Sequence, residues 1–228
     1  MTEQSDPSPP TGAAQAALEW VREGMKLGLG TGRAASAFVQ ALGARVADGF
    51  EITGVPTSEA TAELARGLGI PLARLAEIGR LDITFDGADE VDERLDVIKG
   101  YGAAMVREKV VARSSDQLII LVGPEKLVSQ LGEHGRLPIE VLPFGEVLVR
   151  GELAQFGLDA ELRVDGRGET LVTDNGNWIL DVHEFMVADP LAMETAINNI
   201  AGVVCNGLFA HNAAKVVLVS SADGVMQL

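Results

Sequence analysis

Carboxylates, an amine and a glycine-rich turn lie close together in residues 86–109, DGADEVDERLDVIKGYGAAMVREK. Such groups transfer protons and bind the oxygen atoms of a substrate. The preceding residues 83–85, Ile-Thr-Phe, predict the end of a buried strand, so Asp86 and Asp89 emerge at its carboxyl end. Open α/β sheets bind ligands at the carboxyl ends of their strands. Both aspartates are therefore candidate site residues, with Gly87 and Ala88 between them.

The turn Lys99-Gly100-Tyr101-Gly102 leads into a predicted helix, where free backbone N–H groups bind anionic or polar oxygens. The alternative for Lys99 is a solvated turn lysine. Glu108 lies on the following helix, and taken alone it is typical of a salt-bridged surface glutamate. Lys126 follows a predicted strand at residues 118–122, which places it at the same sheet edge as Asp86.

The other acidic residues of this segment, Glu90, Asp92, Glu93 and Asp96, are typical of a solvated surface. An EF-hand would need oxygen ligands at alternating positions and a glycine at the sixth, and Ala88 and Val91 break that register. The three histidines show no metal-ligand spacing either. We therefore expect no metal.

A second glycine-rich segment, Gly28-Leu29-Gly30-Thr31-Gly32-Arg33, follows a predicted strand and opens a helix. Its N–H groups and the helix dipole could hold a phosphate. The spacing matches neither the dinucleotide fingerprint nor a P-loop, so phosphate binding and a merely tight turn both remain open. Thr57 and Ser58 lie likewise between a strand and a helix, where helix capping explains them most simply.

The chain alternates predicted helices and strands up to about residue 131, which indicates βαβ units and a parallel sheet. Strands are expected at residues 26–29, 52–55, 83–85 and 118–122, and helices at residues 13–22, 34–47, 59–68 and 103–113.

After Gly132 the pattern changes. The segments that follow predict a βαββαβ layer. They are a strand between Pro138 and Pro143, a helix at 144–156, strands around Leu162, Leu171 and Ile179, a helix from Asp189 to Ile200 and a strand near Val203. The Asn-Gly pair of residues 174–177 predicts a turn between two antiparallel strands. The apolar residues 215–220 are expected to return to the first sheet. The predicted fold is thus α/β, with a Rossmann-like, mostly parallel domain at residues 1–131 and 207–228 and a smaller ferredoxin-like α+β domain at residues 132–206.

The composition limits the partners. A formal net charge of -15, with no clustered basic face, argues against nucleic acid, although a few cations can still bind an anionic small molecule. The single cysteine, Cys205, has the apolar flanks of a core residue and fits a reducing compartment. No membrane span or secretory signal is visible, so we expect a cytoplasmic protein, and residues 1–12 are expected to form a loose tail.

From residue 13 to the C-terminus, the chain resembles the ribose-5-phosphate isomerases of type A. The resemblance rests on GLGTG at 28–32, PTSEAT at 56–61, DGADEVD at 86–92, KGYGAAMVREK at 99–109, LPIEVLP at 137–143 and TDNGN at 173–177. It implies interconversion of ribose 5-phosphate and ribulose 5-phosphate through an enediolate, in the non-oxidative pentose phosphate pathway and without a cofactor. It also implies a homodimer or homotetramer.

The resemblance identifies Glu108 as the catalytic base, in place of the surface role that the residue alone suggests. It implies that Asp86, Asp89 and Lys99 handle ring opening and the sugar oxygens, with a raised pKa at Glu108. The implied substrate contacts are Gly30, Thr31, Gly32, Arg33, Ala34, Asp86, Gly87, Ala88, Asp89, Lys99, Gly100, Tyr101, Gly102 and Lys126.

One segment departs from the family pattern. The family usually has Ser-Thr after GTG, whereas this chain has Arg33 and Ala34, and Pro10 or Thr11 stands where the family often has a phosphate-binding lysine. We expect the Arg33 guanidinium to replace these contacts. The alternatives are a non-catalytic sugar-phosphate sensor and an amino-sugar-phosphate deaminase of related fold.

Overall fold

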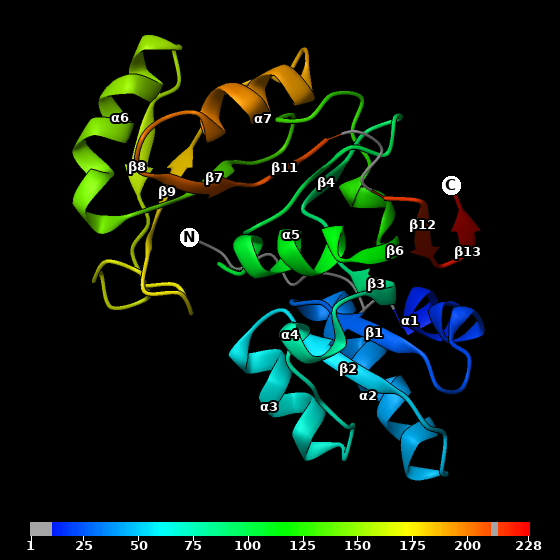
Figure 1. Cartoon of the computed structure of the whole chain (residues 1–228). Coiled ribbons are helices and arrows are strands. Elements are labelled where there is room, and N and C mark those ends of the chain that lie inside the picture. The colour runs from blue at the N-terminus through cyan, green and yellow to red at the C-terminus, as the bar shows by residue number, and fades with distance from the viewer. Residues whose placement is uncertain (1–10, 211–213) are drawn as a thin grey trace.

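The computed structural model describes residues 11–210 and 214–228, in which the strands form three sheets (Figure 1). The largest sheet has the order β13-β12-β6-β3-β1-β2. Its parallel strands are β1 (Lys26–Leu29), β2 (Thr53–Pro56), β3 (Leu81–Asp86), β6 (Ser115–Val122) and β12 (Val216–Ser221). The edge strand β13 (Gly224–Gln227) pairs antiparallel with β12. The predicted parallel sheet and the return of the C-terminal segment are confirmed.

Both faces of this sheet are buried. In β6, Ile119 and Leu121 pack into one core, whereas Leu118, Ile120 and Val122 pack into a second core on the opposite face. Such a continuous apolar run is typical of a parallel strand that is covered on both sides. The first face is covered by α1 (Thr11–Ala17) and α2 (Arg33–Ala47), and the other by α5 (Met105–Arg113).

The second sheet has the order β10-β7-β9-β8, and all its neighbouring strands are antiparallel. Its elements in chain order are β7 (Leu137–Val141), α6 (Glu146–Gln155), β8 (Ala160–Leu162), β9 (Trp178–Val182), α7 (Pro190–Asn198) and β10 (Val203–Asn206). This confirms the predicted βαββαβ order. The carboxylate of Asp189 caps α7 by accepting from Ala192 N at 3.0 Å, with Pro190 in the first turn.

The strand predicted around Leu171 is wrong, because residues 163–177 form a connection that leads from β8 to β9. The Asn-Gly turn therefore does not join two paired strands, although Gly176 does have a φ of 80°. The side chains of Thr173, Asn175 and Asn177 bond to Glu140 on β7. These bonds hold residues 173–177, and the connection before them contains a single antiparallel bridge, between Val164 and Thr170.

A third sheet of three short strands, in the order β11-β5-β4, joins the two larger layers. It consists of β4 (Glu90–Val91), β5 (Val97–Ile98) and β11 (Leu208–Phe209), all paired antiparallel. Val97 and Phe209 pack into a core of the large sheet, whereas Ile98 and Leu208 pack into the core of the second sheet. These strands are not predicted from the sequence.

The surface interpretation of the acidic residues is correct for Glu93 and wrong for Glu90, Asp92 and Asp96, which are buried. Glu90 accepts from the backbone N–H groups of residues 132 and 134, at 2.6 and 2.9 Å. Asp92 Oδ1 accepts from Arg94 N and Asp96 N, both at 2.9 Å. These carboxylates satisfy backbone donors inside the fold.

The first helix ends earlier than predicted and continues as a 3₁₀ turn (Leu18–Trp20). Of the expected tail at residues 1–12, Thr11 and Gly12 belong to α1, and residues 1–10 lie outside the described residues. Cys205 is buried, as predicted. None of the described helices is long and apolar enough to cross a membrane. The other elements are α3 (Glu59–Gly67), α4 (Leu75–Ile78) and two 3₁₀ turns, Pro124–Lys126 and Pro143–Gly145.

Candidate active site

The strand order reverses between β1 and β3, which are neighbours in the large sheet. Within this sheet, the next strand in the chain after β1 is β2, which lies on one side of it. The next strand of the sheet after β3 is β6, which lies on the other side. Loops leave such a switch point in opposite directions and open a crevice at the carboxyl ends of the strands. The glycine loop after β1 and Asp86 at the end of β3 both lie at this position.

Gly30 lets the loop after β1 lie directly on Asp86. A Cβ atom at position 30 would lie 2.3 Å from Asp86 Cγ and 2.6 Å from Phe85 O. Gly30 N donates to Phe85 O at 2.9 Å, and Thr31 N donates to Asp86 Oδ1 at 3.1 Å. The glycine loop and the first aspartate therefore form one unit.

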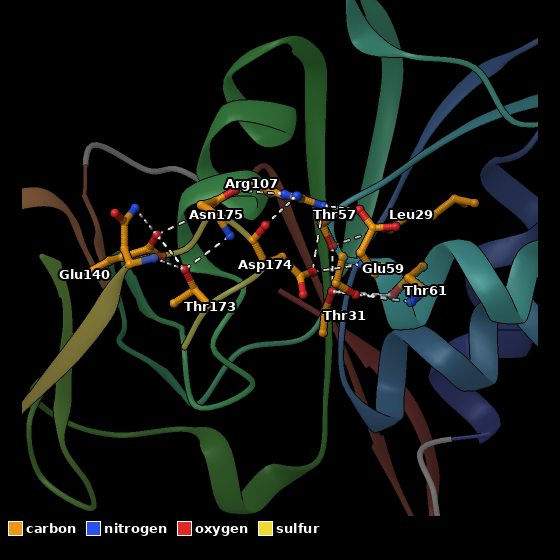
Figure 2. Close-up of polar contacts among 12 residues, drawn as sticks. Leu29, Thr31, Thr57, Glu59, Thr61, Arg107, Glu140, Thr173, Asp174 and Asn175 are labelled. Atoms are coloured by element: carbon orange, nitrogen blue, oxygen red, sulfur yellow. Dashed lines mark hydrogen bonds and ion pairs between the residues drawn. The ribbon is translucent and has the colours of Figure 1, made fainter. Parts of the chain in front are cut away.

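Hydroxyl groups at and just before the start of α3 form hydrogen bonds with this loop (Figure 2). Thr31 Oγ1 lies 2.7 Å from Thr57 Oγ1, and Thr61 Oγ1 donates to Gly30 O at 2.8 Å. Ser58 accepts from Thr61 N at 3.1 Å, so the capping interpretation is confirmed for Ser58. Thr57 has a different role, because it also donates to Leu29 O at 3.1 Å and thus ties the two strand ends together.

Lys99 is the centre of a buried group of three charges. Its Nζ lies 3.1 Å from Asp86 Oδ2 and 3.3 Å from Glu108 Oε1, and it donates to Gly87 O. The three residues are 3%, 1% and 4% exposed, for Lys99, Asp86 and Glu108 respectively. They come from the end of β3, the segment after β5 and the first turns of α5, so only the folded chain brings them together.

Burial raises the pKa of Glu108 to about 8, and the negative charge of Asp86 adds to this effect, while Lys99 opposes it. Burial likewise raises the pKa of Asp86. For Lys99, burial lowers the pKa, but the charges of Asp86, Glu108 and Asp89 together outweigh it and raise the pKa. Glu108 Oε2 is buried and has no hydrogen-bond partner among the described residues. One carboxylate oxygen of Glu108 thus keeps its hydrogen-bonding capacity unused within the described residues.

Asp89 holds the turn that begins at Lys99. Its Oδ2 accepts from Tyr101 N at 3.0 Å, and burial raises its pKa. The Tyr101 side chain contributes to the core of the second sheet, where its hydroxyl accepts from Arg136 N at 2.7 Å. Tyr101 therefore serves the site through its backbone only.

These groups border a cavity of about 610 Å³. The predicted residues that line it are Thr31, Gly32, Arg33, Ala34, Gly87, Ala88, Asp89, Lys99, Gly100, Gly102, Glu108 and Lys126. Gly30, Asp86 and Tyr101 are not part of the lining; Asp86 touches it only through Lys99, to which it is paired.

The sequence analysis missed part of the wall, namely Gly12, residues 121–125 and Ser220, Ser221 and Ala222. Ser220 and Ser221 end β12 and Ala222 follows it, at the same edge of the sheet as Asp86, so the predicted segment 215–220 already indicated their position. In the described residues, no group of three or more His, Cys, Asp or Glu is arranged to hold a metal ion. The arrangement offers a carboxylate with one free oxygen, an ammonium group and backbone donors around one cavity.

Comparison with protein families and known proteins shows one consistent relationship. The family model for ribose 5-phosphate isomerase A (phosphoriboisomerase A) matches residues 53–224. Ribose-5-phosphate isomerase A of Rhodopseudomonas palustris is 51% identical over 219 residues, with 93% of this chain and 94% of that protein covered. The same enzyme of Roseiflexus castenholzii is 47% identical over 218 residues, covering 95% and 93%.

Solved structures agree over nearly the full length. Ribose 5-phosphate isomerase A of Methanocaldococcus jannaschii is 39% identical and superimposes with a TM-score of 0.92, covering 96% of this chain and 97% of that one. A D-ribose-5-phosphate isomerase in complex with phospho-erythronic acid is 40% identical, with a TM-score of 0.93 and 96% of both chains covered.

Proposed function

The chain belongs to the ribose 5-phosphate isomerase A family, and we propose that Glu108, Lys99 and the turn after Lys99 perform its interconversion of ribose 5-phosphate and ribulose 5-phosphate. The observation that carries this assignment is the buried Glu108 carboxyl in the cavity wall, which pairs with Lys99 through Oε1 while Oε2 has no hydrogen-bond partner among the described residues.

The reaction moves one proton between adjacent carbons. In the open-chain aldose, ionised Glu108 removes the proton from C2, and the C–H electron pair forms the C1–C2 double bond of an enediolate. The negative charge then rests on the former carbonyl oxygen, where Lys99 and the N–H groups of the turn stabilise it. A proton then moves from the O2 hydroxyl to O1, the C2–O2 bond becomes the ketose carbonyl, and protonated Glu108 gives its proton to C1. A pKa of about 8 suits this role, because it makes the acid strong enough to return the proton and the base strong enough to remove it.

We assign sugar binding to Asp89 and Lys99, with Asp86 acting through its ion pair with Lys99, and phosphate binding to the glycine loop and Lys126. Gly32 and Arg33 lie at the start of α2, and Lys126 follows β6. Helix N-termini bind anions through free N–H groups, and a guanidinium matches the geometry of phosphate oxygens. Thr11 also lines the cavity, at the position where the family often has a lysine.

An assay with ribose 5-phosphate, comparing wild type with Glu108→Gln, tests the assignment. We expect kcat to fall by roughly 10²–10⁴-fold, because the amide cannot accept the proton. Glu125→Gln is the matched control, since Glu125 also lines the cavity but has no ion pair with Lys99 among the described residues. Equal rates in wild type and Glu108→Gln would remove Glu108 as the base. An inactive wild type would instead favour the sensor or the deaminase.

We further propose a cytoplasmic homodimer or homotetramer that acts in the pentose phosphate pathway. The two-domain division, at residues 1–131 with 207–228 and residues 132–206, is part of the same proposal, supported by the separate cores of the two larger sheets. Phe144, Val147 and Leu148 present an exposed apolar surface on the second sheet's side, which supports its contribution to assembly. A mass measurement in solution tests the oligomer.

A further inference from the structure

A buried arginine from the second sheet reaches the turn that carries the backbone donors of the site. Arg163 directly follows β8 and is 7% exposed. Its Nε donates to Asp181 Oδ2 at 2.7 Å, and its second terminal nitrogen donates to Asp181 Oδ1. Asp181 lies on β9 and is 3% exposed. This paired contact fixes the plane of the guanidinium.

The remaining guanidinium nitrogen, Nη1, holds two consecutive carbonyl groups of the turn. It donates to Gly100 O at 3.0 Å and to Tyr101 O at 3.1 Å. In a trans peptide unit, the N–H group points opposite to the C=O group. The two carbonyls point toward Arg163, so the N–H groups of Tyr101 and Gly102 point away from it, toward the site.

The partners of these two N–H groups differ. Tyr101 N donates to Asp89, which lines the cavity. Gly102 also lines the cavity, and its N–H has no hydrogen-bond partner in the described part of the chain. A donor in this position is available to a substrate oxygen.

The turn itself has an unfavourable backbone. Gly100 has a φ of 112°, and Ala103, a residue with a Cβ atom, has a φ of 61°. Such conformations persist where surrounding contacts hold them. Two sets of hydrogen bonds hold the carbonyl groups of this turn. Ala103 N donates to Gly100 O within the turn, and Arg163 donates to Gly100 O and Tyr101 O from the second sheet.

We propose that Arg163 is a positioning residue for the isomerase. Locked by Asp181, it aims the Gly102 N–H at the oxygen that becomes negative in the enediolate, and keeps the Tyr101 N–H on Asp89. Its positive charge at the carbonyl end of these peptide units also polarises their N–H groups. This inference rests on the proposed isomerisation at Glu108, and it makes the second sheet a part of the catalytic apparatus.

The test is a kinetic comparison of Arg163→Met with wild type, using ribose 5-phosphate. Misaimed donors weaken transition-state binding more than ground-state binding, so we expect kcat to fall about 10–100-fold and KM to change less than about threefold. Arg163→Lys, which cannot hold Asp181 and both carbonyls in the same geometry, should fall between the two.

Arg136→Met is the matched control. Arg136 Nε also lies near Asp181, at 3.4 Å, and its guanidinium stacks on the Tyr101 ring, but no bond joins this side chain to the turn's carbonyls in the described residues. We expect its kcat to remain within about twofold of wild type. If Arg163→Met folds poorly, the double variant Arg163→Met/Asp181→Leu removes both charges together and still lacks the aimed guanidinium.

A folded Arg163→Met enzyme with wild-type kcat would overturn the proposal, as would an equal loss in Arg136→Met. An increase in KM alone would also contradict it, since the donors would then act on substrate binding only. These outcomes differ from failure of the proposed function, in which wild type itself shows no isomerase activity or Glu108→Gln retains it.

Discussion

The neighbours of Glu108 shift its pKa in opposite directions. Burial and the charge of Asp86 favour the protonated carboxyl, whereas the ammonium group of Lys99 favours the carboxylate. Lys99 Nζ lies 3.1 Å from Asp86 Oδ2 and 3.3 Å from Glu108 Oε1, so one positive charge acts on both carboxyl groups. Lys99 thus allows a carboxylate to exist in a place that would otherwise exclude it.

The pH dependence of the reaction follows from the raised pKa. The base must be ionised, so kcat/KM should rise about tenfold per pH unit below an apparent pKa of about 8 and level off above it. Lys99 keeps its proton beyond that point because its pKa is raised as well. Rates measured from pH 5.5 to 9 check this. An acid limb centred at the ordinary glutamate value of 4.5 would contradict it.

Arg33 opens α2 and lines the cavity beside the glycine loop. We expect Arg33→Ala to raise KM for ribose 5-phosphate about 10–100-fold with little change in kcat, since a charge-assisted bond to phosphate contributes about 1.5–3 kcal/mol. Arg33→Lys should recover part of the loss. Arg94→Ala, which removes an exposed arginine outside the cavity lining, serves as the control. An unchanged KM in Arg33→Ala would show that the phosphate is held without the Arg33 guanidinium.

The sequence predicts a site residue well where the end of a strand fixes its position. It predicts a site residue poorly where distant segments of the chain bury the side chain. Asp86 and Lys126 follow strands that the sequence pattern indicates. Glu108 by itself is typical of a surface residue, and only the family resemblance identifies it. The reason is physical: its burial depends on Asp86 and Lys99, which lie nine or more residues away.

At the scale of elements, the loop after β1 depends on the missing side chain at Gly30. We expect Gly30→Ala to lower the free energy of unfolding by about 1–3 kcal/mol and to reduce activity strongly, because the new methyl group would overlap Asp86 and the backbone of Phe85. Chemical denaturation and the isomerase assay measure the two effects.

Gly67→Ala is the control for this substitution. Gly67 ends α3 on the surface, and no atom lies within 4 Å of the position its Cβ would take. The stability of this variant should equal or exceed that of wild type. A Gly30→Ala protein as stable as Gly67→Ala would mean that β1 and β3 can separate at little cost.

Long elements with clear periodicity could be predicted within a few residues, as α2 and β12 show. The strands β4, β5 and β11 have two residues each, too few for any periodicity, and they form only because distant segments meet. The error at Leu171 has the same origin, since the polar side chains that follow it bond to Glu140 on β7.

At the scale of the whole molecule, a polar network links the large sheet's layer to the second sheet (Figure 2). Glu140 on β7 accepts from Asn175 Nδ2 at 3.1 Å, and Asn175 Oδ1 accepts from Arg107 on α5 at 3.0 Å. Arg107 also bonds to Glu59 at the start of α3 at 2.8 Å. Since Arg107 is adjacent to Glu108, this network holds the helix of the proposed base from both layers.

We expect Arg107→Met to loosen this connection. Residues 173–177 should exchange their amide hydrogens faster, the unfolding temperature should fall by about 2–4 °C, and kcat should fall more than KM changes because Glu108 is less firmly placed. Arg74→Met is the control, since Arg74 pairs with Glu77 within a single short helix and should alter none of these quantities appreciably. Unchanged exchange at residues 173–177 would mean that Glu140 alone fixes the segment, and the two layers would then be held together by the small third sheet and its cores.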